Sequence, residues 1–167
     1  YFGVSDSVDL DSLTWKGGGY DIRELDRIYT GDDVRAGLVL DKVREILTNP
    51  LQARGLGFCV SVVHAEFMAK FFSVRGVPSL ALSAQSSTDD RRAAQRRLVS
   101  REVNFLFVVD LYNEGVDIPE VDTVLFLRPT ESLTIFLQQL GRGLRLHKEK
   151  DCLTVLDFIG AQHKRFR

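Results

Sequence analysis

The sequence predicts an α/β domain, a three-layer α/β/α arrangement in which helices cover both faces of a mainly parallel sheet. Short apolar segments alternate along the chain with longer segments of helical periodicity. The apolar segments are continuous rather than alternating apolar and polar, which is typical of strands that are buried on both faces. The length of 167 residues suits a single domain.

Five strands are predicted from the apolar and β-branched segments. They cover residues 58–63, 79–83, 105–109, 123–127 and 153–157. In parallel sheets with right-handed crossovers, ligands bind beyond the C-terminal ends of the strands. Because Ser61, Ser83, Asp110 and Asp157 fall at these ends, we expect this edge of the sheet to carry the function.

Four helices are predicted before and between these strands, each bounded by a start or stop signal. Ser87 is a suitable N-cap because acidic residues follow it in the first helical turn. The expected limits are Asp32 to Asn49-Pro50, His64 to Gly76-Val77-Pro78, Ser87 to about Arg101, and from Pro129-Thr130 onward.

The first 31 residues differ from the remainder of the chain. They are polar and contain Gly17-Gly18-Gly19, so we expect residues 1–31 to form a linker or lead-in segment with a short helix near residues 22–28. The domain then covers residues 32–167. Because the chain begins without methionine and ends without a terminating signal, we expect it to be a piece of a longer polypeptide.

The composition limits the classes of function. The formal net charge of −1 argues against nucleic-acid binding by bulk charge alone, although arginines gather locally at positions 91, 92, 96, 97 and 101. No apolar run approaches the roughly 20 residues needed to span a bilayer, and no signal peptide is visible. Cys59 and Cys152 lie in apolar segments, which favours free thiols in the cytoplasm, although a disulfide between them stays possible.

The most informative segment runs from Gln138 to Arg145. On a helix, Gln138, Arg142 and Arg145 lie on one stripe, while leucines lie roughly opposite and can pack on a core. Arginine forks of this kind match phosphate oxygens in two-point hydrogen bonding. The stripe indicates phosphate binding or phosphoryl transfer, although arginines near a helix C-terminus are also favoured by the helix dipole alone.

A second segment, Glu114-Gly115-Val116-Asp117-Ile118-Pro119, follows the third predicted strand. Its glycine allows close approach of the backbone to a phosphate or sugar. Its carboxylate can accept hydrogen bonds from a ribose or position a water molecule. A plain turn is the competing interpretation, because Asn, Gly, Asp and Pro are common turn residues.

Together and in this order, Gly115-x-Asp117, Arg128-Pro129-Thr130 and Gln138 to Arg145 resemble the second, C-terminal RecA-like domain of superfamily-two helicases. The resemblance covers about residues 32–158. It is closer to the type III restriction subunits and related DNA helicases than to the RNA DEAD-box branch. It implies a RecA-like fold and the C-terminal motor domain of an ATP-dependent helicase or translocase, with DNA preferred to RNA as the partner.

The resemblance also implies roles for individual residues. Arg142 and Arg145 would reach the γ-phosphate of ATP as arginine fingers, while Gly115, Asp117 and Gln138 would face the nucleotide. The expected nucleic-acid contacts are Ser61, His64, Ser83, Arg91, Val109 and Asp110.

Two departures and two absences qualify this picture. Many relatives carry Thr where Val109 stands and Arg where Gln139 stands. The sequence has no Gly-x-x-x-x-Gly-Lys-Ser/Thr phosphate loop and no Asp-Glu-x-His/Asp magnesium motif. We therefore expect ATP and Mg²⁺ to be held mainly by a first RecA-like domain of the same polypeptide. We also expect the isolated chain to be inactive and to have no metal site of its own.

Two alternatives come from other classes of protein. Asp110, Asp117 and Asp157 lie at or near strand ends, where carboxylates could bind Mg²⁺ in a hydrolase or phosphotransfer domain. A catalytically inactive interaction module that keeps the helicase fold is the second alternative. Retention of both arginines and of Gly115-x-Asp117 argues against it.

Overall fold

The computed structural model describes residues 33–109, 120–128 and 154–158 in full. For residues 2–3, 15–16 and 19–20 it describes the path of the backbone. The helices of these described residues include none that is long and apolar enough to cross a membrane.

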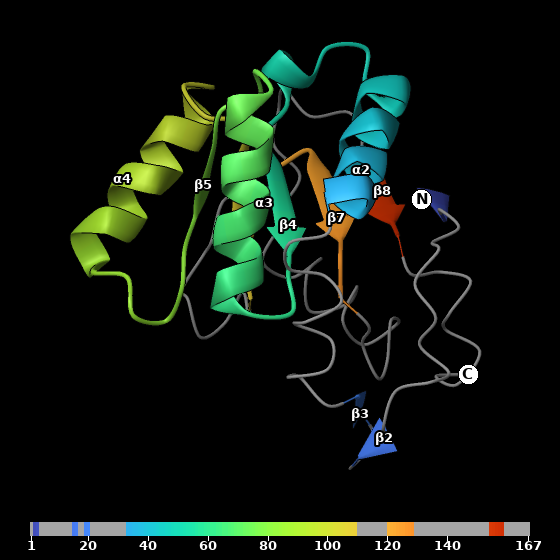
Figure 1. The fold of residues 1–167 in the computed structure, drawn as a ribbon. Helices are drawn as coiled ribbons and strands as arrows, with labels where there is room; N and C mark the ends of the chain where they lie inside the picture. Colours follow the sequence, from blue (N-terminus) through green and yellow to red (C-terminus); the bar gives the residue numbers. More distant parts are fainter. Residues whose placement is uncertain are drawn as a thin grey trace.

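A six-stranded sheet forms the centre of the described structure (Figure 1). Every pairing within it is parallel, which confirms the mainly parallel sheet that the sequence predicts. Its strands are β1 (Phe2–Gly3), β4 (Gly55–Phe58), β5 (Ser79–Ala81), β6 (Phe105–Val108), β7 (Thr123–Phe126) and β8 (Thr154–Asp157). Their order across the sheet is β1-β8-β7-β4-β6-β5.

The first 31 residues contribute strands that sequence patterns did not indicate. β1 pairs with β8 and so extends the sheet at one edge. β2 (Trp15–Lys16) and β3 (Gly19–Tyr20) form a separate antiparallel pair. A two-residue strand is too short to show periodicity, so β1 had no signal that could be read from the sequence.

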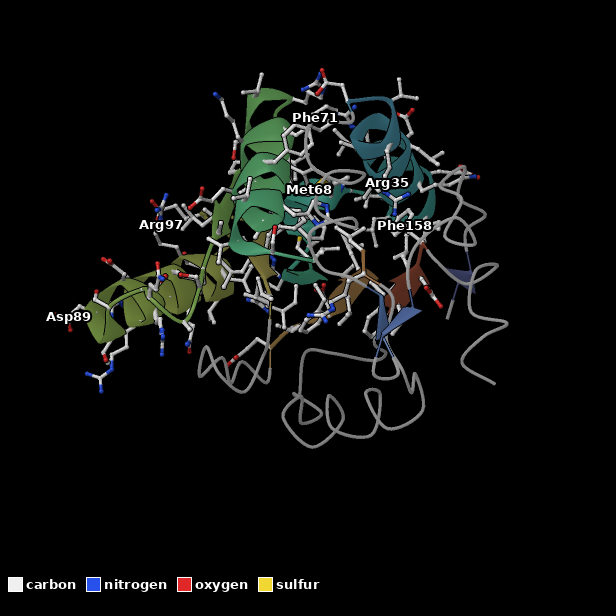
Figure 2. All side chains as sticks on the ribbon, turned by 60° about the horizontal axis from the view of Figure 1, so that its bottom comes forward. Arg35, Met68, Phe71, Asp89, Arg97 and Phe158 are labelled. Atoms are coloured by element: carbon white, nitrogen blue, oxygen red, sulfur yellow. The ribbon has the colours of Figure 1, made fainter. Side chains whose placement is uncertain are left out.

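Three helices of the described chain pack on the sheet. These are α2 (Asp33–Ile46), α3 (Val62–Val74) and α4 (Thr88–Val99), with a short 3-10 turn, η1 (Pro50–Gln52), after α2. Buried residues of α2 and α3 share one apolar cluster, and those of α4 belong to a second cluster on the opposite face. Figure 2 shows Phe71 of α3 on the side of that helix toward α2. Helices therefore cover both faces, as predicted.

The chain path explains why α3 and α4 lie on opposite faces. After β4 the chain passes through α3 to β5 at the edge of the sheet, and then returns through α4 to β6, which lies between β4 and β5. Both crossovers are expected to be right-handed, and they cross the sheet in opposite directions. Two such crossovers place their helices on opposite faces of the sheet. This reversal next to β4 is the kind of switch point at which α/β sheets bind ligands.

Glycines in β4 determine how the centre of the sheet packs. A Cβ atom at Gly55 would lie 2.2 Å from the Phe105 ring, and one at Gly57 would lie 2.4 Å from the Phe107 ring. Phe72 of α3 contacts both rings edge-on, with centroid separations of 5.4 Å and 5.1 Å. The absence of side chains on one face of β4 therefore makes room for three interlocking phenylalanines.

The prediction of a strand over residues 58–63 is wrong. The strand spans Gly55–Phe58, and Val62 and Val63 form the first turn of α3. The Ser61 hydroxyl accepts a hydrogen bond from the His64 N–H at 3.1 Å and caps the helix, an effect that outweighs the strand preference of the two valines. The glycines of β4, which disfavour a strand in isolation, concealed its true start.

The other limits predicted within the described residues agree with the structure to within about three residues, as helix and strand ends commonly do. The helix predicted from Pro129-Thr130 onward and the short helix predicted near residues 22–28 lie outside the described residues. Gly76 follows α3 with a φ of +90°, a conformation that favours glycine and that ends the helix where it was expected. Ser87 accepts a hydrogen bond from the Asp90 N–H at 3.0 Å as the N-cap of α4. Asn49 caps the 3-10 turn instead of extending α2, because its side chain accepts from the Leu51 N–H.

Candidate nucleic-acid and nucleotide site

Three of the predicted nucleic-acid residues lie just beyond the C-terminal ends of three neighbouring strands. Ser61 follows β4, Val109 follows β6 and Ser83 follows β5, and these strands are adjacent in the sheet. Neighbouring strands lie about 4.8 Å apart, so the three ends span about 10 Å. That span matches about three nucleotides of one strand at a rise of about 3.4 Å.

The turn between β4 and α3 is held by side chains as well as backbone. The Cys59 N–H donates to the Val108 carbonyl at 2.8 Å and continues the ladder between β4 and β6 by one residue. The next donor, the Val60 N–H, bonds the Nδ1 atom of His64 at 3.0 Å. Ser61 is half-buried, whereas His64 is only 2% exposed. The structure thus places Ser61 at the surface of this edge and the His64 imidazole behind it.

The turn after β5 is compact and carries Arg91. The Ser83 N–H donates to the Ser86 hydroxyl, and the Ser83 hydroxyl accepts from the Gln85 N–H. Nη2 of Arg91, in the first turn of α4, donates to the carbonyls of Ser83 and Ala84 at 3.3 Å and 2.6 Å. Because carbonyl groups carry no net charge, the positive charge of Arg91 is held at this edge without being neutralised by these contacts.

Val109 contributes its backbone to the edge. Its carbonyl accepts a hydrogen bond from Nη1 of Arg128 at 3.3 Å. Arg128 follows β7, and β4 lies between β7 and β6, so this guanidinium group reaches across the end of β4. Sequence reasoning noted Arg128 only as part of a motif. The sequence signal for its hydrogen bond to Val109 was its position two residues after a buried strand and directly before Pro129.

The predicted nucleotide residues lie outside the described part of the chain. These are Gly115, Asp117, Gln138, Arg142 and Arg145, together with the predicted nucleic-acid contact Asp110. Their segments adjoin described residues, because Asp110 follows Val109 and Pro129 follows Arg128. In the sequence, the two nucleotide motifs follow β6 and β7, the two strands that flank β4.

The described residues offer little to a magnesium site. They contain no group of three or more His, Cys, Asp and Glu side chains that could hold a metal ion. Asp157 is fully buried at the end of β8. Since β7 and β4 separate β8 from β6, roughly 14 Å lies between the ends of β8 and β6, much more than the 2.0–2.1 Å of a magnesium–oxygen bond. A site that joins Asp157 to carboxylates at the end of β6 has no support in this geometry.

A parallel RecA-like sheet with arginine and Gly-x-Asp motifs following its central strands defines the class of helicase motor domains. The chain belongs to the family described as the helicase conserved C-terminal domain, whose model matches residues 39–147.

Relatives and solved structures agree with this family. Residues of this chain are 33% identical over 104 positions to IRC3 of Saccharomyces cerevisiae, which is named as an ATP-dependent helicase; the match covers 62% of this chain and 15% of that protein. They are 29% identical over 149 positions to the type I restriction enzyme EcoKI endonuclease subunit of Escherichia coli, covering 77% and 13% of the two chains.

The fold resembles that of the E. coli DEAD-box protein SrmB, solved in complex with the regulator of ribonuclease activity A. The TM-score is 0.60 at 21% sequence identity, and the match covers 74% of this chain and 68% of the SrmB chain. This likeness confirms the RecA-like fold. The chain spans less than a fifth of the length of the two curated relatives named above.

Proposed function

We propose that this chain is the C-terminal motor domain of an ATP-dependent DNA helicase or translocase. Ser61, Ser83 and Val109 form part of its nucleic-acid track. Arg142 and Arg145 act as arginine fingers on ATP that is bound by a first RecA-like domain of the same polypeptide. Gly115, Asp117 and Gln138 face that nucleotide. Insertion of an arginine finger increases turnover by about 10³–10⁵-fold in enzymes that use one.

The observation that carries this proposal is the arrangement of strand ends around β4. The three candidate nucleic-acid segments follow β4, β6 and β5, and the two nucleotide motifs follow β6 and β7. One edge of one sheet therefore serves both ligands. A change at the nucleotide can reach the nucleic-acid track through residues such as Arg128, which connects the ends of β7 and β6.

The charge distribution at the helix starts supports a phosphate-binding role near α3. The first turn of α3 contains no acidic residue, so the positive end of its dipole is not offset locally. The first turn of α4 carries Asp89 and Asp90, which repel phosphate; Figure 2 shows Asp89 at the outer end of that helix. Contacts to phosphate and sugar are independent of sequence and weaken as salt concentration rises.

ATP and Mg²⁺ are assigned mainly to the first RecA-like domain. This sequence lacks the phosphate loop, and the described residues contain no carboxylate cluster for a metal ion. When bound, Mg²⁺ would help to neutralise charge on the transferred phosphoryl group. The isolated chain is therefore expected to show ATP hydrolysis no faster than a protein-free control. ATP turnover clearly above that control would contradict the assignment of ATP and Mg²⁺ binding to the first RecA-like domain.

DNA is proposed as the substrate in preference to RNA. Support comes from the match to a restriction endonuclease subunit and from the motif resemblance to type III restriction subunits. The competing Mg²⁺-dependent hydrolase predicts phosphatase or nuclease activity in the isolated chain with Mg²⁺. The inactive interaction module predicts no turnover in the full-length protein.

The function is tested by nucleic-acid-stimulated ATP hydrolysis of the full-length parent protein. We expect single-stranded or duplex DNA to raise the rate at least about tenfold over the basal rate, with RNA less effective, and the DNA concentration for half-maximal stimulation to rise with salt. Equal stimulation by RNA would overturn the DNA assignment. Absence of any stimulation would overturn the motor assignment.

A further inference from the structure

Two hydrogen bonds connect His64 to the turn that precedes α3. The Ser61 hydroxyl accepts from the His64 N–H at 3.1 Å, and Nδ1 of His64 accepts from the Val60 N–H at 3.0 Å. In the usual capping box, a Glu or Gln at the third helical position returns the bond to the N-cap residue. Here a histidine occupies that position and reaches one residue further back.

The Val60 N–H has a particular need for this acceptor. The Cys59 N–H is bonded to the Val108 carbonyl, and the chain then turns away from the sheet. Val60 is only 3% exposed, and a buried N–H without a partner is costly. Nδ1 can accept only when it carries no proton, so this bond requires the neutral imidazole with its hydrogen on Nε2.

We propose that His64 is a positioning residue for the nucleic-acid track. Its neutral imidazole holds the turn from Cys59 to Ser61 in the conformation that meets the nucleic-acid backbone, and the imidazole itself makes no contact with nucleic acid. This inference rests on the proposed function, because it assumes that the end of β4 lies on the track.

Exposure separates a positioning role from a contact role. His64 is 2% exposed, whereas Val62 and Val63 beside it are 38% and 53% exposed. Ser61 is half-buried at the same corner. A phosphate or sugar that approaches the start of α3 therefore meets the turn and the two valines, with the imidazole beneath them.

The test uses the full-length parent protein with three substitutions at one position. His64→Asn keeps an acceptor at the δ position, His64→Gln moves it to the ε position, and His64→Leu removes it. Met68→Leu is a control, because Met68 is buried on the same helix and tolerates a swap of similar volume. The readouts are the DNA concentration for half-maximal ATPase stimulation, kcat at saturating DNA, and the thermal midpoint of each variant.

We expect the half-saturating DNA concentration to rise about tenfold in His64→Leu and His64→Gln, equivalent to about 1.4 kcal/mol. In His64→Asn it should stay within about threefold of wild type, and kcat should stay within about twofold in all three. Met68→Leu should leave half-saturation unchanged. Loss in His64→Asn equal to that in His64→Leu, or a fall in kcat at unchanged half-saturation, would overturn the positioning role.

Wild-type protein provides a second measurement that does not depend on a substitution being tolerated at the turn. In ¹⁵N-histidine-labelled full-length protein near pH 7.5, the His64 signals should report an unprotonated, hydrogen-bonded Nδ1 and a protonated Nε2. An imidazolium, or the opposite tautomer, would overturn the inference while leaving the DNA-stimulated ATPase intact. Absence of DNA stimulation in the wild type would instead overturn the proposed function, and this inference with it.

Discussion

At Gly55 and Gly57 the missing side chains have a structural purpose. The rings of Phe105 and Phe107 occupy the space where Cβ atoms would otherwise lie, and Phe72 of α3 packs edge-on against both. Interiors of this density accommodate an extra methyl group only by moving their neighbours. Since Phe105 and Phe107 precede Val109 in the same strand segment, such movement would reach the nucleic-acid edge.

Gly57→Ala should lower the free energy of unfolding of the chain by about 1–3 kcal/mol, because the new methyl group meets the Phe107 ring at 2.4 Å. Urea titration followed by circular dichroism measures the change. Gly37→Ala is the matched control. Gly37 lies inside α2 with no atom closer than 4.0 Å to the added Cβ, so alanine should raise stability by about 0.5–1 kcal/mol. Equal effects of the two substitutions would refute this packing argument.

At the scale of elements, helix caps decide where strands and helices meet. Ser61 starts α3 and Ser87 starts α4, each by accepting from the N–H three residues later. These two caps also lie at the edge of the sheet that carries the candidate nucleic-acid residues. A cap that holds the start of its helix in place therefore also holds the neighbouring candidate nucleic-acid residues in place.

Ser87→Ala should destabilise the first turn of α4 by about 1 kcal/mol, because the Asp90 N–H loses its acceptor. Amide hydrogen exchange should show faster exchange confined to the first turn of α4, with α3 unchanged. Ser87→Asp keeps an acceptor and should restore protection. Faster exchange spread evenly over both helices would mean that the cap stabilises the whole domain and not the start of α4.

Elements also show what the sequence could and could not predict. Strands β5 to β8, helices α2 and α4, and the end of α3 at Gly76 follow from the apolar pattern and stop signals. The strand over residues 58–63 was misplaced, because the β-branched valines of the first turn of α3 resemble a strand and the glycines of β4 do not. Periodicity reports burial, whereas the Ser61 cap and the Gly–Phe packing depend on contacts with neighbouring elements.

For the candidate site, the sequence predicted that the candidate residues gather at one edge of the sheet, but not the hydrogen bonds that their side chains make. Ser61, Ser83 and Val109 do follow strands that are adjacent in the sheet. The hydrogen bonds of His64 to Val60, of Arg91 to the Ser83 and Ala84 carbonyls, and of Arg128 to Val109 needed coordinates. Whether these residues bind nucleic acid stays a prediction, as does the role of Arg142 and Arg145.

At the scale of the molecule, one sheet separates two apolar clusters, and the candidate residues gather at one of its edges. The first cluster lies under α2 and α3, and the second lies under α4. All strands of this sheet run parallel, so the chain leaves β4, β5, β6 and β7 at the same edge. A domain of this kind can meet a nucleic acid and a nucleotide together, and closure against a first domain would couple hydrolysis to movement along the strand.

The central claim is that Arg142 and Arg145 act on ATP held by another domain. The most direct measurement is DNA-stimulated ATP hydrolysis by the full-length parent protein, beside Arg142→Ala, Arg145→Ala and the control Arg96→Ala. Arg96 is exposed in the last turn of α4, far along the helix from the functional edge. We expect kcat to fall by about 10³-fold or more in the first two variants with ATP binding retained, and Arg96→Ala to match wild type. Unchanged kcat in Arg142→Ala and Arg145→Ala would contradict the arginine-finger account and show that the stripe is structural.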